Sequence, residues 1–255
     1  MKFIDFFSGI GGFRRGMELA GHECVGHCEI DKYADASYRS MHTITEAQRE
    51  YLSTLTLKQR QKEILKGEYL NGEWFADDIT RVLPESLPDA DIYCFGFPCQ
   101  SFSIAGQRRG FEDTRGTLFF EVLRLAKERK PEILFGENVA GLLNHDRGRT
   151  FATLLNAMGD VGFDCEWQVL NSRYLGVAQN RARVFLIGHL RGGVEDKYFL
   201  SQQSIRRLMS YKDTKVYEDE NDAESNTLTA KRRDQCGIYP MSGGGVIKVN
   251  GYHKS

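Results

Sequence analysis

Short apolar runs alternate with segments of helical periodicity along the first 190 residues of this 255-residue chain. A strand-like run at residues 2–7 breaks into a glycine turn at 8–12, and a helical segment follows until Gly21 stops it. The same patterns predict further strands at 24–30, 91–97, 132–136, 163–170 and 183–189, and further helices at 117–130 and 150–158. Strands that alternate with helices through short turns favour an α/β fold, in which helices cover both faces of a mainly parallel sheet.

Two segments depart from this alternation. Residues 31–67 are charged and mostly helical in pattern, and within them 43–66 has the character of an amphipathic insertion or a solvated helix pair, to which we assign no chemistry. Residues 191–255 carry an acidic run, a basic triplet and a glycine cluster without a core pattern. We therefore predict a main domain over 1–190 and a separate small region over 191–255.

The composition excludes several classes of protein. Lys and Arg total 34 against 35 Asp and Glu, and 41% of the residues are hydrophobic. These values exclude a disordered chain, a polybasic nucleic-acid coat and a coiled coil, so any contact with DNA or a membrane must be local. Six cysteines are too few for a disulfide scaffold, and no secretory signal or long apolar stretch is present. We therefore expect free thiols in a reducing cytoplasm.

The first glycine turn is a candidate nucleotide site. Ligands of open α/β sheets bind beyond the carboxyl ends of the strands, where glycines let the backbone approach them. Glu29 lies 20 residues after Gly9, a spacing at which an acid can accept hydrogen bonds from ribose hydroxyls. The dinucleotide fingerprint fails at its third glycine, where Arg14 stands, so a simple tight strand-to-helix connection is the alternative.

The tripeptide Asp77-Asp78-Ile79 could complete such a site. A carboxylate suits the exocyclic amine of an adenine, and an apolar side chain suits the face of its ring. A helix cap is the alternative interpretation of the same residues.

Cys99 is a candidate nucleophile. It follows Gly96-Phe97-Pro98 at a strand end and precedes a polar loop, so its thiol should project into the crevice. An inert surface thiol is the alternative, whereas Cys94, in the middle of the strand, is expected to be a small buried hydrophobe.

Two further strand ends carry charged groups. Glu137-Asn138-Val139 ends the next predicted strand, which places a carboxyl group near Cys99 if the two strands are neighbours. Arg181 and Arg183 share one face just before the last strand. They form either a solvated edge or an anion clamp that lowers the pKa of the thiol or binds phosphate.

Together these motifs resemble one family. Asp5-x-Phe7-Ser8-Gly9-x-Gly11-Gly12, Gly96-Phe97-Pro98-Cys99-Gln100, Arg115-Gly116-x-Leu118-Phe119, Glu137-Asn138-Val139 and Gln179-x-Arg181-x-Arg183 occur in the order typical of DNA (cytosine-5) methyltransferases. The resemblance covers roughly residues 2–190. It implies a Rossmann-like domain of bacterial or phage origin. This domain would bind S-adenosylmethionine, release S-adenosylhomocysteine and need no metal. Its substrate would be double-stranded DNA, as for the methyltransferases of restriction-modification systems.

The resemblance also implies roles for individual residues. The Cys99 thiolate attacks C6 of a flipped-out cytosine, Glu137 holds N3 and the exocyclic amine, and C5 then accepts the methyl group. Arg183 contacts the target base or a nearby phosphate, and Arg181 supports the loop. The implied cofactor residues are Phe7, Ser8, Gly9, Gly11, Gly12, Glu29, Ile30, Asp78, Ile79, Pro98 and Leu118. The implied DNA-binding residues are Gln100, Ser101, Ser103, Gln107, Arg108, Arg109 and Arg183.

The sequence departs from the family pattern after the last predicted strand. The closing motif of the family and most of its target-recognition region are not found before Ser255, so the resemblance implies that residues 191–255 are the start of an incomplete target-recognition region. Three explanations of this departure are open: a split enzyme, a truncation, or a non-catalytic remnant that binds the cofactor or a partner. We expect little methylation by residues 1–255 alone, and activity once a second polypeptide supplies the missing segments.

A zinc deaminase is the rival enzyme class. His27-x-Glu29 followed by Pro98-Cys99 is half of its signature, but Phe102 stands where the second cysteine ligand is needed. The metal site would lack one ligand, which favours the methyltransferase.

Overall fold

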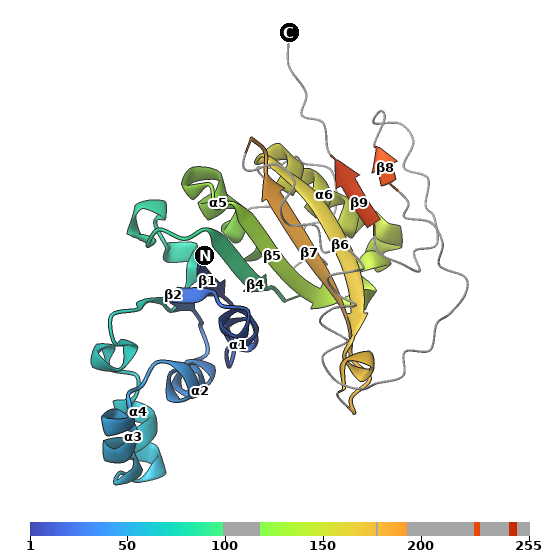
Figure 1. The fold of residues 1–255 in the computed structure, drawn as a ribbon. Helices are drawn as coiled ribbons and strands as arrows, with labels where there is room; N and C mark the ends of the chain where they lie inside the picture. Colours follow the sequence, from blue (N-terminus) through green and yellow to red (C-terminus); the bar gives the residue numbers. More distant parts are fainter. Residues whose placement is uncertain (99–117, 177, 193–226, 230–244, 249–255) are drawn as a thin grey trace. The chain divides into compact units, whose positions relative to one another are not determined.

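The computed structural model describes residues 1–98, 118–176, 178–192, 227–229 and 245–248. The chain forms two compact units, residues 1–137 and 138–255 (Figure 1). Each unit is described by itself. The predicted boundary at residue 190 stays a prediction.

The first unit is built on a parallel sheet with the strand order β3-β2-β1-β4-β5. Its strands are β1 (Lys2–Phe6), β2 (Glu23–Cys28), β3 (Trp74–Ala76), β4 (Ile92–Gly96) and β5 (Ile133–Val139), the last of which runs into the second unit. From β1 the chain winds outward to β2 and β3, and then returns to the other side of β1 for β4 and β5. The winding direction therefore reverses between β1 and β4, which is the place where open α/β sheets bind ligands.

Helices cover both faces of this sheet. Met17 of α1 (Gly12–Leu19) packs with Phe3, Ile92 and Cys94 on one face. Phe119 of α5 (Leu118–Arg129) lies 6.0 Å, ring centre to ring centre, from Phe95, whose side chain points to the opposite face because side chains alternate along a strand. The prediction of a parallel sheet covered on both faces is confirmed for this unit.

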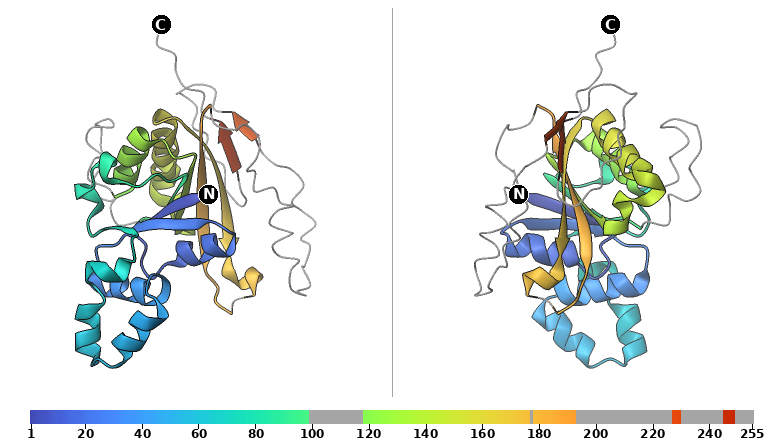
Figure 2. Two further views of the ribbon diagram at one scale, coloured as in Figure 1. Left: turned by 60° about the vertical axis from the view of Figure 1, so that its left-hand side comes forward. Right: turned by 90° about the vertical axis from the view of Figure 1, so that its right-hand side faces the viewer.

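A helical extension follows β2. It comprises α2 (Lys32–His42), α3 (Glu46–Ser53), α4 (Leu57–Glu63) and the short 3-10 helix η1 (Gly67–Leu70). Two more 3-10 helices, η2 (Ile79–Arg81) and η3 (Pro84–Ser86), lie between β3 and β4. The helices α3 and α4 each start with a capping box, and they enclose a small core of Leu52, Ile64 and Tyr69 with Ala36 of α2. This pair lies away from the strands of the unit, as Figure 2 shows, so the predicted solvated helix pair at 43–66 is confirmed.

The second unit contains a twisted antiparallel hairpin. It comprises η5 (Ala140–Leu143), η6 (His145–Gly148), α6 (Arg149–Asp160), β6 (Phe163–Asn171), η7 (Ser172–Leu175), β7 (Ala182–Leu190), β8 (Thr227–Thr229) and β9 (Gly245–Lys248). Within it the strand order is β7-β6-β9-β8, and β6 is antiparallel to both of its neighbours. The ring of Phe151 on α6 packs against Trp167 of β6, with 5.3 Å between the ring centres. The α/β class is confirmed, with antiparallel pairing in this unit.

Candidate cofactor and active site

The glycine turn after β1 has the left-handed backbone that its sequence suggests. Phe7, Gly9 and Gly11 have φ angles of 55°, 55° and 89°. The N–H of Gly11 donates to the carbonyl of Ser8 at 2.8 Å, and the N–H of Ser8 donates to the carbonyl of Cys28 at 3.2 Å. These bonds hold the turn against the end of β2.

Glu29 is fixed against this turn by its own carboxylate. Oε2 accepts a hydrogen bond from the N–H of Gly9 at 2.7 Å, and Oε1 accepts one from the N–H of Asp31 at 2.8 Å. A carboxylate oxygen can accept more than one hydrogen bond, so both oxygens retain capacity for ligand hydroxyls. The neighbouring Ile30 is 77% exposed and offers an apolar surface beside the carboxylate.

Two buried polar atoms lie at the carboxyl end of β1. Among the described residues, Asp5 Oδ1 and Ser8 Oγ have no hydrogen-bond partner. Burial raises the pKa of Asp5 well above its usual range, although its Oδ2 accepts a hydrogen bond from the N–H of Arg14 at 3.3 Å. Unsatisfied buried polar atoms are rare in native proteins, so this end of β1 fits a polar ligand.

Asp78 adopts the helix-cap alternative in the structure. Its Oδ1 accepts hydrogen bonds from the hydroxyl of Thr80 at 2.7 Å and from the N–H of Thr80 at 3.0 Å. These two bonds hold the pKa of the Asp78 carboxyl below its usual range. Ile79 is 2% exposed and belongs to the core, so a cofactor role for either residue stays a prediction.

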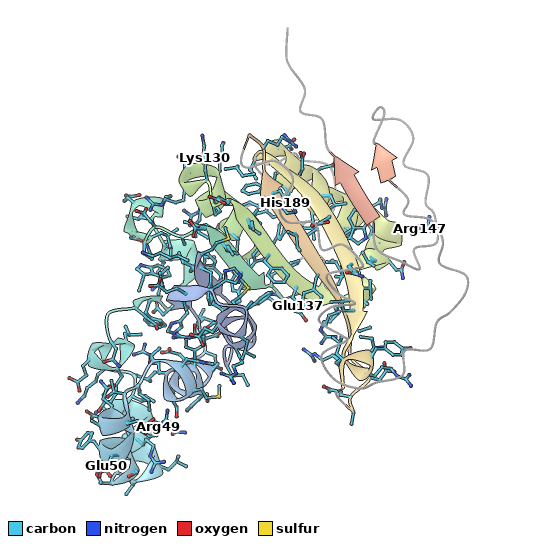
Figure 3. All side chains as sticks on the ribbon, viewed as in Figure 1. Arg49, Glu50, Lys130, Glu137, Arg147 and His189 are labelled. Atoms are coloured by element: carbon cyan, nitrogen blue, oxygen red, sulfur yellow. The ribbon has the colours of Figure 1, made fainter. Side chains whose placement is uncertain are left out.

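The strands that carry the candidate catalytic groups are neighbours. Gly96 of β4 pairs with Glu137 of β5, and Glu137 Oε2 lies 3.7 Å from the position that a Cβ at Gly96 would occupy. Figure 3 labels Glu137 at the end of β5. We expected Glu137 to lie near the Cys99 segment if these two strands were neighbours. The pairing of β4 with β5 meets that condition.

Several predicted residues can be placed only partly. Pro98 is exposed and Leu118 is half-buried at the start of α5. Cys99 and the predicted DNA-binding residues Gln100, Ser101, Ser103, Gln107, Arg108 and Arg109 lie outside the described residues. Cys94 is fully buried, and burial raises the pKa of its thiol well above the usual range, as expected for an inert cysteine.

The two predicted arginines lie in the second unit. Arg181 is exposed, and its N–H donates to Asn171 Oδ1 at 3.2 Å. Arg183 is half-buried on β7, and its Nη1 donates to the carbonyl of Ala182 at 2.9 Å. Asn171 was missed by the sequence analysis.

Buried ion pairs hold α1 and α2, and the sequence analysis missed them too. Arg14 is 4% exposed, and its two terminal nitrogens bind the carboxylate of Glu73 at 2.6 and 2.7 Å. Asp35 bridges Arg39 and the fully buried His27, with 2.9 Å from Asp35 Oδ1 to His27 Nε2. His27 Nε2 is therefore engaged, which argues against the deaminase reading of this motif.

Gly11 provides a test of the turn geometry. A Cβ at this position would lie 2.3 Å from His42 Nε2, which contacts the carbonyl of Ile10 at 3.1 Å. Because a left-handed φ adds strain, we expect Gly11→Ala to lower the free energy of unfolding by about 1–3 kcal/mol. Gly16, exposed within α1 with open space around it, is the matched control, and Gly16→Ala should stabilise by about 0.5–1 kcal/mol. Urea unfolding measures both, and equal effects of the two substitutions would contradict the assigned geometry.

The described part of the chain contains neither a candidate metal cluster nor a candidate membrane-spanning helix. Its residues include no cluster of three or more His, Cys, Asp or Glu that could hold a metal ion. None of its helices is both long enough and apolar enough to span a membrane.

Comparisons with known proteins agree with this arrangement. The family model for C-5 cytosine-specific DNA methylase matches residues 1–67 and 62–239. The type II methyltransferase M.HhaI of Haemophilus parahaemolyticus is 40% identical over 187 residues, covering 73% of this chain and 48% of the relative. M.HpaII of Haemophilus parainfluenzae is 38% identical over 214 residues, covering 83% of this chain and 52% of that relative. The orphan methyltransferase M.SPRI of Bacillus phage SPR is 38% identical over 190 residues, covering 74% of this chain and 37% of that relative.

A solved structure shows the same fold. The S. pombe Dnmt2 methyltransferase superposes with a TM-score of 0.56 at 16% identity, covering 88% of this chain and 59% of that one. The chain spans about half the length of the curated relatives that it matches. Since the family model matches most of the sequence, the chain belongs to the C-5 cytosine-specific DNA methylase family.

Proposed function

We propose that this chain acts in the transfer of a methyl group from S-adenosylmethionine to C5 of cytosine in double-stranded DNA. The observation that carries the proposal is the placement of the family motifs around one sheet edge. The glycine turn and Glu29 follow the carboxyl ends of β1 and β2, and Glu137 lies near the carboxyl end of β5, on the other side of the point where the winding reverses. Membership of the methylase family supports the reaction.

The described residues fit the proposed cofactor. Glu29 would accept hydrogen bonds from the ribose hydroxyls, because Gly9 and Asp31 already orient its carboxylate. Ile30 would pack against the adenine, and the buried Ser8 Oγ would gain a polar partner. When bound, S-adenosylmethionine supplies an electrophilic methyl group.

The chain would prepare the cytosine as a nucleophile. C5 of an aromatic ring attacks poorly, and a temporary covalent bond at C6 divides one difficult step into easier ones. The Cys99 thiolate would add to C6 while Glu137 holds N3 and the exocyclic amine. C5 would then form a bond to the methyl group as the bond from that methyl group to its sulfonium sulfur breaks, which leaves S-adenosylhomocysteine. Removal of the C5 proton as the C6–S bond breaks would restore the ring and release the thiolate.

The target base must leave the duplex for this chemistry, because a stacked ring is inaccessible to a thiol. We propose that Arg183 contacts the base or a nearby phosphate at this stage and that Arg181 supports the loop. The segment that follows Cys99 would contact the DNA.

Transfer of a labelled methyl group to duplex DNA tests the proposed function. The assay uses the chain by itself and the chain with a second polypeptide that carries the rest of a target-recognition region, because the relatives are about twice as long. We expect incorporation at C5 of cytosine in at least one of the two. Binding of S-adenosylhomocysteine without any incorporation would contradict methyl transfer, and absence of both would contradict the whole proposal.

Glu29→Ala tests the cofactor site separately. Loss of a charged hydrogen bond costs about 1.5–3 kcal/mol, so the affinity for S-adenosylhomocysteine should fall roughly 10-fold to 150-fold in calorimetry. Glu23→Ala is the matched control, since Glu23 is exposed at the opposite end of β2. Unchanged affinity in a folded Glu29→Ala protein would contradict the assigned role.

A further inference from the structure

The turn between β6 and β7 is held in place by side-chain hydrogen bonds. We call residues 172–176 and 178–181 the hairpin tip. The side chain of Asn171 holds it from inside: Oδ1 accepts hydrogen bonds from the N–H groups of Arg173 and Arg181, both at 3.2 Å, and Nδ2 donates to Asn180 Oδ1 at 2.7 Å. The hydroxyl of Ser172 donates to the carbonyl of Gln179 at 2.6 Å. The side chains on the tip are therefore presented from a fixed backbone, at the end of a long hairpin (Figure 1).

The tip presents an aromatic ring and a guanidinium to solvent. Tyr174 is 67% exposed and Leu175 is 48% exposed, and Arg173 beside them is exposed as well. The guanidinium carbon of Arg173 lies 5.4 Å from the centre of the Tyr174 ring, within the range of a cation–π contact. An exposed ring and a stacked guanidinium provide both an apolar face and a planar set of donors.

The charge around the tip has one sign. Residues 167–194 contain no Asp or Glu, in a chain whose net charge is −1. Arg191 at the other end of the hairpin binds Asp164 at 2.8 Å, whereas neither Arg173 nor Arg181 forms an ion pair with any of the described residues. The tip is thus a local basic surface that complements a polyanion.

We propose that Arg173 and Tyr174 bind the sugar–phosphate backbone of duplex DNA, in addition to the contact expected of Arg183. This inference rests on the proposed function and extends the DNA-binding surface beyond the family motifs. The Arg173 guanidinium donates to phosphate oxygens, and the Tyr174 ring packs against a deoxyribose. Backbone contacts fix the position and register of a protein on DNA without reading its sequence, so the contact serves to position the duplex.

Salt-dependent binding of the full chain to a fluorescently labelled DNA duplex tests the inference. One lost phosphate contact reduces the slope of log K against log[salt] by about 0.9. If the contact is purely electrostatic, Arg173→Ala should then bind roughly 15-fold more weakly at about 50 mM salt and roughly 4-fold more weakly at about 200 mM. Arg173→Lys should keep the slope. Tyr174→Ala should weaken binding without changing the slope.

Arg49→Ala is the charge-matched control, because Arg49 is exposed on α3, where it pairs with Glu46 at 3.6 Å (Figure 3). It should leave both affinity and slope unchanged. An Arg173→Ala protein that binds like the wild type would overturn the inference, and methyl transfer by the wild type would then leave the proposed function standing. Tighter binding to an RNA duplex of the same sequence would overturn the choice of DNA. A wild-type chain that binds no duplex, either alone or with the second polypeptide, would overturn both proposals.

Discussion

Replacing Asp35 by alanine is expected to lower the free energy of unfolding by about 3–5 kcal/mol. The Asp35 side chain is 3% exposed, and its two oxygens bind Arg39 at 2.9 and 2.8 Å. Removing the carboxylate leaves the guanidinium of Arg39 buried without its counter-charge, and His27 loses its partner as well. Arg39 also donates to the carbonyls of Ile64 and Lys66, which anchors α2 to the segment that follows α4. The effect is therefore expected at the junction between the sheet and the helical extension.

Urea unfolding followed by circular dichroism measures this change. Glu46→Ala is the control, because the exposed pair of Glu46 and Arg49 should contribute less than about 1 kcal/mol. The double variant Asp35→Ala with Arg39→Met removes both charges, and it should recover part of the loss, since a buried pair is often replaceable by apolar groups. A single Asp35→Ala change of under about 1 kcal/mol would contradict this account of the pair.

The periodicity of the sequence predicted where the strands and helices lie better than it predicted which strands pair. Alternating apolar runs correctly placed β4 at Ile92–Gly96 and α5 at Leu118–Arg129, because local burial determines those patterns. The proximity of Glu137 to Gly96 depended on which strands pair, and a hydrophobic pattern does not specify strand order. The antiparallel pairing of β6 with β7 was not predicted for the same reason, since both pairing directions use similar apolar runs.

Arg14 shows what the sequence could not predict about the candidate site. In the sequence, Arg14 stands where the dinucleotide fingerprint needs its third glycine. In the structure its side chain pairs with Glu73, 59 residues further along the chain. No local pattern specifies such a pair, because its partners are brought together only by tertiary folding. The spacing of Asp35 and Arg39, four residues apart on one helix, is in contrast a signal that the sequence does carry.

Cys99→Ser is expected to lower the rate of methyl transfer by a factor on the order of 10³ or more, because a hydroxyl is a far weaker nucleophile than a thiolate. The sharper measurement is covalent trapping on a duplex with 5-fluorocytosine at the target. After methyl transfer C5 carries fluorine in place of the proton that must leave, so the C6–S bond cannot break. The wild-type chain, in whichever assembly transfers methyl groups, should form an adduct that survives denaturing electrophoresis.

Cys94→Ala is the matched control for this experiment. Cys94 lies five residues earlier on β4, but it is fully buried, and burial raises the pKa of its thiol well above the usual range, which disfavours the thiolate. Trapping should therefore persist in a folded Cys94→Ala protein and disappear in Cys99→Ser. The reverse result would move the nucleophile to the sheet interior, where a flipped base has no access, and would contradict the proposed mechanism. Trapping that persists in both variants would assign the adduct to another residue.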